Sequence, residues 1–561
     1  MGKWEIADCE VIVRSVLHVQ RKFKIPDLLL AELKEHVAGR QVSKGIALLD
    51  SHAQLFNSID PEQRNAAAFV GHVAQWVDIG YREPALLERL LRRFPKGVRA
   101  RLPLCDYLQL RMAEGLLALL HDEPDEALPH FDLVVSMQDE IEEKELVAIA
   151  QFWNARCHRK KGEYDESLKH AGEARKYASS LGFPKMAAVM QVLESWILFQ
   201  KGHLRDAARI LDQAEQALRH TDDHITLGNI YSAHGRMIRR KGRYNEALQY
   251  FTRAIDQFRK RSSEHRNLAR SLANIAYVQR LVAVQISKEI DAESARRRKT
   301  GNVSAAGNKK QRQRETYEHM RAQAFANLEQ AERIYRHHNH HHGIGSIYEN
   351  RGLLYLDIGD LDNAGTQAAQ AYGVGKEEDD FILLARARLL QCTIENAKLE
   401  EELEGSTESW EHAHAAREYA REALEAARHT QNQRLIARAY IWRGLTSCNP
   451  FFNDTEDAKH CCDAANSLLR AVDYDDLWEE LQLLKQKIVP KGNIDPVLRS
   501  WSQGITGEKS FQELAEQFAE LVIPKVWEKE GKKVSRVATR LSISPKKVRR
   551  ILVRLGKIKK G

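Results

Sequence analysis

Apolar residues recur along most of the chain at the i, i+3, i+4 spacing of helices, and residues that interrupt helices are scarce. The 561 residues include 31 glycines and 13 prolines, and no proline stands between Pro184 and Pro450. A stretch of that length without proline favours continuous helical structure. No run of alternating β-branched and aromatic residues is bounded by turn residues, as a strand would be. The sequence therefore predicts an all-α fold.

A short motif recurs every 40 residues and predicts helical hairpins. Its clearest copies have a Lys-Gly pair at 161–162, 201–202 and 241–242, with Ala or Ser five positions after the Gly. Each motif lies between two apolar helical patterns, so the Gly closes the first helix and the small residue lets the second pack closely. The residues that define the repeats are Gly162, Tyr164, Gly202, Ala207, Gly242, Tyr244, Ala247, Gly359 and Ala364.

These turns resemble those of the tetratricopeptide repeat, whose turn carries Gly-x-Tyr-x-x-Ala and whose second helix carries a further small residue, here Ala174, Ala214 and Ala254. The usual unit has about 34 residues, so the longer period implies longer helices. Weaker copies extend the array, with divergent repeats over residues 1–104 and the main solenoid over 105–488. The resemblance implies nine or ten helical pairs, starting near residue 10, and a concave surface for a protein or peptide ligand.

One repeat is interrupted by a basic segment. Ala247 and the matching Ala324 are 77 positions apart instead of 40, and residues 294–314 between them contain eight Lys or Arg and no acid. We interpret about 291–314 as a disordered loop within a helical pair. This loop is either a second contact with nucleic acid or an acidic partner, or a solvated insertion. A smaller acidic stretch, residues 400–408, predicts a solvated insertion in the following unit.

The composition changes after Leu484, where prolines and glycines cluster and indicate a linker over residues 489–509. Ser510 and Glu513 then form a capping box at the start of a new helix. We expect Pro524 to kink this helix or split it in two. The apolar face of the helix carries Phe511, Leu514, Phe518, Leu521 and Val522.

Residues 533–552 predict a helix-turn-helix. The turn is Ser542 to Ser544, with Ile543 inserted into the core, Ser544 capping the second helix and Pro545 in its first position. Two apolar stripes at helical spacing form the shared core. They are Val534, Val537, Ala538 and Leu541 in the first helix, and Val548, Ile551, Leu552 and Leu555 in the second.

This end of the chain resembles the Fis-type DNA-binding domain found at the end of many bacterial enhancer-binding activators, and we assign residues 510–561 to it. The resemblance rests on Gly531-Lys532, on residues 537–543 and on Leu555-Gly556. Ser542 replaces the glycine of the family's turn, at a position that often favours a positive φ. The resemblance implies a second helix that reads the DNA major groove.

The distribution of charge predicts that a polyanion binds at the same end of the chain. The net charge is +8, and residues 531–561 contain twelve Lys or Arg and no acid, whereas the chain outside the two basic segments is acidic. This indicates that the basic tail contacts a polyanion, which for a helix-turn-helix would be double-stranded DNA. The family resemblance implies a homodimer through residues 511–530, with half-sites about 34 Å apart. The predicted DNA contacts are Lys532, Lys533, Ser544, Lys546, Lys547, Arg549, Arg550 and Arg554.

The sequence indicates no enzyme and no cofactor, because it holds no phosphate loop and no recognisable catalytic motif. The helical pairs His337/His341 and His338/His342 are candidate metal ligands, but cysteines and carboxylates that would support a site are missing and adventitious binding is the simpler interpretation. Seven cysteines without a Cys-x-x-Cys pair, no secretory signal and no long apolar window indicate a cytoplasmic protein that does not contact membranes.

Together these features predict a cytoplasmic, bacterial, DNA-binding transcriptional regulator whose tetratricopeptide-like solenoid binds a protein or peptide. The alternative is a non-enzymatic interaction scaffold whose basic C-terminal end binds RNA or an acidic partner. Salt-dependent binding with a sequence preference would support the first, and equal affinity for any polyanion would support the second.

Overall fold

The computed structural model describes residues 24–300, 307–401, 407–470, 476–488 and 510–558, and every regular element within these ranges is a helix. The all-α prediction is confirmed. The chain forms two compact units that divide after Leu484. None of the described helices is long and apolar enough to cross a membrane. The predicted linker and the predicted start of the array near residue 10 lie outside the described residues.

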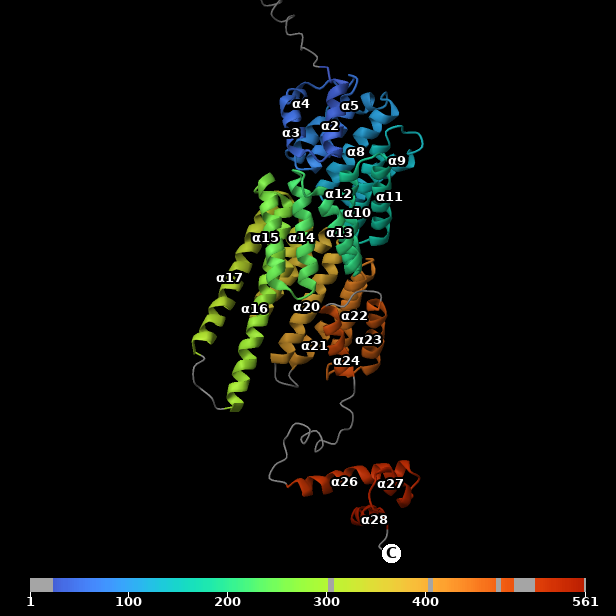
Figure 1. Ribbon diagram of the computed structural model, residues 1–561, viewed down its shortest axis with the longest axis vertical. Coiled ribbons are helices and arrows are strands. Elements are labelled where there is room, and N and C mark those ends of the chain that lie inside the picture. The colour runs from blue at the N-terminus through green and yellow to red at the C-terminus, as the bar shows by residue number, and fades with distance from the viewer. Residues whose placement is uncertain (1–23, 301–306, 402–406, 471–475, 489–509, 559–561) are drawn as a thin grey trace, which may run out of the picture. The chain divides into compact units, whose positions relative to one another are not determined.

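The first unit is a solenoid of helical hairpins (Figure 1). It begins with α2 (Asp27–Ala38), α3 (Val42–Ser51), α4 (Leu55–Ser58), α5 (Ala66–Asp78), α6 (Pro84–Leu91) and α7 (Lys96–Arg99). The first helices of the following hairpins are α8 (Leu104–Leu120), α10 (Lys144–Lys161), α12 (Pro184–Lys201), α14 (His224–Arg240), α16 (Arg266–Thr300), α18 (His341–Asp357), α20 (Phe381–Glu401) and α22 (Gln433–Ser447). The second helices are α9 (Pro124–Ser136), α11 (Tyr164–Ser180), α13 (Leu204–Leu218), α15 (Tyr244–Arg261), α17 (Gly307–His337), α19 (Leu361–Glu377), α21 (Thr407–Arg428) and α23 (Thr455–Leu469), and α24 (Asp476–Ile488) follows them.

The turn glycines have the backbone conformation that the repeat motif predicts. Gly162, Gly202, Gly242 and Gly359 have φ values of 80°, 89°, 73° and 77°. Only glycine adopts this left-handed conformation without strain. One repeat upstream, Asp122 has a φ of 75° in the corresponding turn. The turn chemistry therefore sets the boundary between the two helices of each hairpin.

The small residues of the repeats are the points of closest packing between helices. Ala207, Ala247 and Ala364 are fully buried, and so are the second-helix residues Ala174, Ala214 and Ala254. Tyr164 is buried as well, whereas Tyr244 is partly exposed. A larger side chain at the alanine positions would push the helices of a hairpin apart.

The first helices of successive hairpins also contact one another, from α10 through α12, α14, α16, α18 and α20 to α22. Within the same unit α12 contacts both α2 and α22. The Gln431 backbone N–H donates to the Gly162 carbonyl at 2.9 Å, and the Asp165 N–H donates to Gln431 Oε1 at 2.5 Å. These contacts join segments far apart in the sequence, so the solenoid curves until the row of first helices faces inward. We call this row the inner surface.

The described part of the basic insertion is helical and does not form a loop. Residues 291–300 extend α16 and residues 307–314 begin α17, while residues 301–306 lie outside the described residues. The two helices pack along each other as a long hairpin, and Lys310 Nζ lies 3.3 Å from Ser294 Oγ. For residues 291–300 and 307–314 the expectation of a loop does not hold, because Lys, Arg, Gln and Ala are strong helix formers even where they present no apolar face.

His72 makes the solenoid sensitive to acid. It lies 8% exposed in α5, its Nδ1 has no hydrogen-bond partner among the described residues, and burial together with Lys34 lowers its pKa to about 4. An unfolded histidine has a pKa near 6.5, so below that pH the unfolded chain binds a proton that the folded His72 does not. The stability gained from keeping His72 neutral is therefore complete above pH 6.5 and is lost as the pH falls toward 4.

We expect the unfolding free energy of the native chain to fall by about 2 kcal/mol more than that of His72→Gln between pH 7 and pH 5. Urea unfolding of both proteins at the two pH values measures the difference. An equal fall in both would show that His72 does not titrate on unfolding.

The second unit contains α26 (Phe511–Lys529), α27 (Val534–Arg540) and α28 (Pro545–Arg554). Its core consists of Ile523, Trp527, Val537, Ala538, Val548, Ile551 and Leu552, with Val534, Leu541 and Ile543 packed partly against it. This agrees with the predicted apolar stripes except at Leu555, which is 39% exposed. Leu555 follows the end of α28, so it no longer continues that helix's buried face.

α26 is one continuous helix of 19 residues with Pro524 inside it, so of the two expected outcomes, a kink or a split, the split is wrong. Ile523 and Trp527, on either side of the proline, are both buried in the shared core and hold the helix together. The predicted capping box of Ser510 and Glu513 is present. Phe511 and Phe518, by contrast, remain 86% and 50% exposed.

Candidate nucleic-acid interface and inner surface of the solenoid

The two turns of the second unit need left-handed backbone. Gly531 and Lys532 between α26 and α27 have φ values of 65° and 63°, and Ser542 between α27 and α28 has a φ of 51°. The Ser542 position therefore has the conformation for which glycine is favoured. Serine and lysine adopt it at some cost in strain.

The start of α28 is fixed by its own sequence. The Ser544 side chain accepts a hydrogen bond from the Lys547 backbone N–H at 3.2 Å, and Pro545 occupies the first turn, where no backbone donor is needed. Val548, Ile551 and Leu552 face the core. The remaining side chains of α28 therefore lie on the side away from that core.

All eight residues predicted to contact DNA lie in the second unit, on or next to α27 and α28. Lys546 and Arg549 are exposed, Lys547 is half-buried, and none of the three makes an ion pair within the part of the chain that the structure describes. Lys533 is exposed and precedes α27 directly, and the Lys532 ammonium lies 5.9 Å from the centre of the Trp527 ring.

Two of the predicted DNA contacts bind α26 instead of projecting freely. Arg550 forms an ion pair with Glu516, and Arg554 bonds Glu516 at 3.0 Å and also pairs with Glu520. The hydrogen bond from Arg554 lowers the pKa of the Glu516 carboxyl, and Arg550 adds to the effect. The sequence analysis missed this pairing; the one signal was the i, i+4 spacing of the two glutamates on one helix.

The histidine tract does not form the predicted helical pairs. His337 ends α17 and His341 begins α18, and Asn339 between them has a φ of 47° that breaks the helix. The tract therefore offers no i, i+4 pair to a metal ion. Its histidines contact other groups: His338 Nε2 lies 2.6 Å from the Glu264 carbonyl, His341 lies 3.3 Å from Glu378, and His342 binds Asp380.

Two other groups of possible ligand atoms occur within the described ranges. In the first, with His460 and Cys461, Asp457 already accepts hydrogen bonds from Arg443 and Ser447. In the second, with Asp212, His234 Nε2 lies 3.0 Å from Glu215 Oε2, and this bond lowers the pKa of the glutamate. Their carboxylates are engaged in ordinary polar contacts, so neither group stands out as a metal centre.

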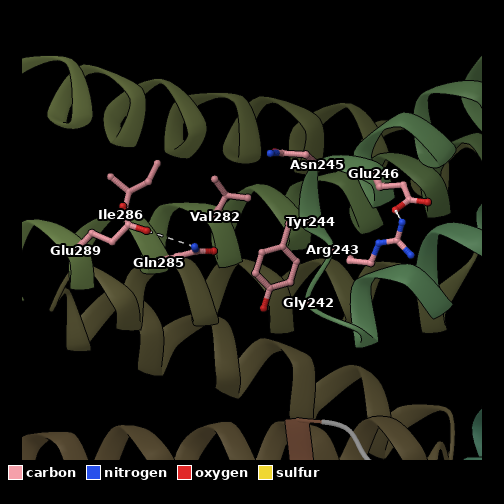
Figure 2. Close-up of a pocket in the computed structure, with 9 residues that line it drawn as sticks. All are labelled: Gly242, Arg243, Tyr244, Asn245, Glu246, Val282, Gln285, Ile286 and Glu289. Atoms are coloured by element: carbon pink, nitrogen blue, oxygen red, sulfur yellow. Dashed lines mark hydrogen bonds and ion pairs between the residues drawn. The ribbon is translucent and has the colours of Figure 1, made fainter. Parts of the chain in front are cut away.

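A hollow of about 440 Å³ lies beside the turn between α14 and α15 (Figure 2). It is lined by the turn itself, by the first residues of α15 and by α16 from Val282 to Glu289. Its charged groups are engaged with neighbours: Arg243 bonds Glu246 at 2.5 Å, and Gln285 donates to Glu289 at 3.3 Å. The charged residues of the lining, Arg243, Glu246 and Glu289, are therefore all paired within the hollow.

The inner surface of the solenoid carries a group of arginines that the sequence analysis missed. We call it the inner arginine cluster: Arg159 on α10, Arg236 and Arg239 on α14, and Arg266 and Arg270 on α16. Burial, together with nearby arginines, lowers the pKa of Arg159 to about 9 and that of Arg266 to about 10. The same causes hold the pKa of Arg236 well below its usual range.

The repeats can be compared with known proteins. Residues 226–282 match the tetratricopeptide repeat family. The match covers most of α14, all of α15 and about half of α16, where the clearest copy of the predicted turn lies. No curated protein matches the chain.

Solved structures with a similar fold cover most of the chain at low sequence identity. A Rap protein complexed with competence and sporulation factor is 13% identical, with a TM-score of 0.49 over 71% of this chain and 98% of its own. The apo quorum sensor NprR from B. thuringiensis is 13% identical, with a TM-score of 0.35 over 79% and 97%. An IFIT1 monomeric mutant with Gppp-AAAA is 12% identical, with a TM-score of 0.44 over 79% and 96%.

Proposed function

We propose that the chain is a cytoplasmic, non-enzymatic transcriptional regulator that binds double-stranded DNA through α28 and a protein or peptide ligand through its solenoid. The observation that carries the DNA-binding half is the face of α28 opposite its core. There Ser544 caps the helix, and Lys546, Lys547 and Arg549 make no ion pair among the described residues. A short helix with an apolar inner face and a basic outer face suits the major groove.

The residues take different parts in this proposal. Arg549 presents a guanidinium that can pair with guanine in a bidentate manner, and the two lysines attract phosphates. Arg550 and Arg554 brace α28 against α26 through Glu516 and Glu520, which keeps the reading helix in one orientation.

The same unit supports the proposed homodimer. Phe511 and Phe518 leave apolar area of α26 exposed, and a second copy of α26 would cover it. Two copies would then present two recognition helices about 34 Å apart, on half-sites related by two-fold symmetry.

The first test is selection of duplexes from a random pool by the full-length protein, followed by binding of the selected duplex. We expect Lys546→Ala/Lys547→Ala to weaken binding at least tenfold at 0.15 M salt and to reduce the salt dependence by about two phosphate contacts. The measurement is the dissociation constant over a series of salt concentrations.

Lys525→Ala/Lys529→Ala is the matched control, because it removes the same charge from exposed positions on α26. It should bind the selected duplex with nearly native affinity. Equal weakening by both variants, or no sequence preference in the selected pool, would contradict DNA reading by α28 and favour a scaffold with a generally basic end.

A further inference from the structure

The inner arginine cluster concentrates positive charge that the protein itself does not neutralise. The side chains of Arg159, Arg236 and Arg266 make no hydrogen bond or ion pair with any residue that the structure describes. The Arg270 side chain has one polar contact within the described ranges, a hydrogen bond that its Nη2 donates to Asn229 Oδ1 at 2.6 Å. Buried cations in folded proteins are normally paired with an acid or a ligand. Arg236 is buried and the other members are half-buried, so the cluster departs from that rule most clearly at Arg236.

The one carboxylate that acts on the cluster is already in use. Asp78 contacts Arg156 Nη1 at 2.6 and 2.7 Å and accepts a hydrogen bond from Trp153 Nε1 at 3.1 Å. It raises the pKa of Arg266, but no carboxylate acts in this way on Arg159, Arg236 or Arg270. One shared aspartate is thus left to balance several guanidinium groups.

Arg236 is the member of the cluster whose charge is least compensated. Its side chain is 8% exposed, and its buried Nε has no hydrogen-bond partner within the described ranges. Desolvation and the charges of Arg270, Arg239 and Arg159 together oppose its charged form. An anion placed among these groups would supply both the missing hydrogen-bond acceptors and the missing negative charge.

The aromatic neighbours indicate which anion fits. The Arg159 guanidinium lies 5.0 Å from the centre of the Trp196 ring, Arg240 lies 3.5 Å from Phe199, and Arg239 lies 4.6 Å from Tyr277. Nucleic-acid sites use aromatic faces as platforms on which bases stack. Here arginines already cover the aromatic faces on which bases would stack. The planar guanidinium groups of these arginines match carboxylates in a bidentate manner. These contacts favour an acidic peptide.

We infer that the inner surface of the solenoid binds an acidic peptide, whose carboxylates contact the inner arginine cluster through Arg159, Arg236, Arg266 and Arg270. This inference rests on the proposed function, because it names the chemistry of the peptide that the solenoid takes. Binding neutralises the cluster and ties α10, α14 and α16 to one ligand. The peptide therefore stabilises one curvature of the solenoid.

The test uses the full-length protein and two fluorescein-labelled probes, hexaglutamate and hexaglutamine. We expect hexaglutamate to bind with a dissociation constant that rises with salt, and hexaglutamine to bind at least tenfold more weakly. Arg236→Met and Arg159→Met should each weaken hexaglutamate at least tenfold. Hydrogen exchange should show that hexaglutamate protects α10, α14 and α16.

Two controls separate this site from the basic C-terminal end and from general charge loss. Arg421→Met removes an exposed arginine that pairs with Glu418 on α21, and it should leave binding unchanged. Lys546→Ala/Lys547→Ala should also leave the protection of α10, α14 and α16 unchanged. Circular dichroism melting confirms that each variant is folded.

Three results would overturn the inference: native affinity of hexaglutamate for Arg236→Met, protection confined to the second unit, or tighter binding of a uridylate hexamer than of hexaglutamate to the cluster. The proposed function has a separate test. If hexaglutamate fails but a peptide selected from a random library binds the solenoid, that function stands and only the acidic chemistry is wrong. If no selected peptide binds, the peptide-binding function is wrong as well.

Discussion

Replacing Phe251 by Ala is expected to lower the unfolding free energy of the solenoid by about 3–5 kcal/mol. The Phe251 side chain is fully buried between α14 and α15, in the core that continues into α16 and α17. Gly235 gives it room, since a Cβ at that glycine would lie 2.8 Å from the ring. Close packing on every side leaves a cavity that the alanine variant cannot close.

The loss should spread to neighbouring hairpins, because each repeat of a solenoid is stabilised mainly by the repeats on either side. Hydrogen exchange should speed up in α14 to α17, while α26 to α28 remain unchanged. Phe451→Ala is the matched control, since Phe451 is 40% exposed and its removal should cost under about 0.5 kcal/mol. A cost below about 1 kcal/mol for Phe251→Ala would contradict the packing described for this core.

The repeat array was predictable because its signals are local. A turn glycine such as Gly242 and a small residue such as Ala247 stand five positions apart, and both act within one hairpin. The basic insertion was not predictable in the same way. Its charged residues carry no apolar periodicity, so only their helix propensity and the pairing of α16 with α17 favour helix.

The same distinction separates the two candidate sites. The outer face of α28 could be predicted because the Ser544 cap, Pro545 and the basic residues follow one another directly. The pairing of Arg554 with Glu516 joins residues 38 positions apart, and the spacing of Glu516 and Glu520 on one helix does not show which residue they bind.

The inner arginine cluster depends still more on tertiary structure. Arg159 and Arg270 are separated by two complete hairpins, and each taken alone has the pattern of an ordinary solvated arginine. Only the curvature that aligns the first helices makes them neighbours. That curvature in turn depends on contacts such as Gln431 with Gly162, between distant parts of the same unit.

Arg236→Met is expected to raise the unfolding free energy of the ligand-free protein by about 1–4 kcal/mol, even though it should weaken binding of an acidic peptide. Replacing a buried charge by an apolar side chain of similar length removes a desolvation cost when no partner is left behind. Arg236 has no such partner among the described residues, and methionine can fill its space beside Phe199. The midpoint of urea unfolding in the absence of peptide measures the change.

Arg388→Met gives the comparison, because Arg388 lies against Tyr372 but bonds Glu422 at 2.5 Å. Its loss leaves a carboxylate without its partner, so we expect a decrease of about 1–3 kcal/mol. If Arg236→Met raises the unfolding free energy and Arg388→Met lowers it, the native Arg236 costs stability. That is expected of a group whose role is to bind an anionic ligand. A decrease for both would mean that Arg236 serves the packing of α14, and that its missing partner has no bearing on binding.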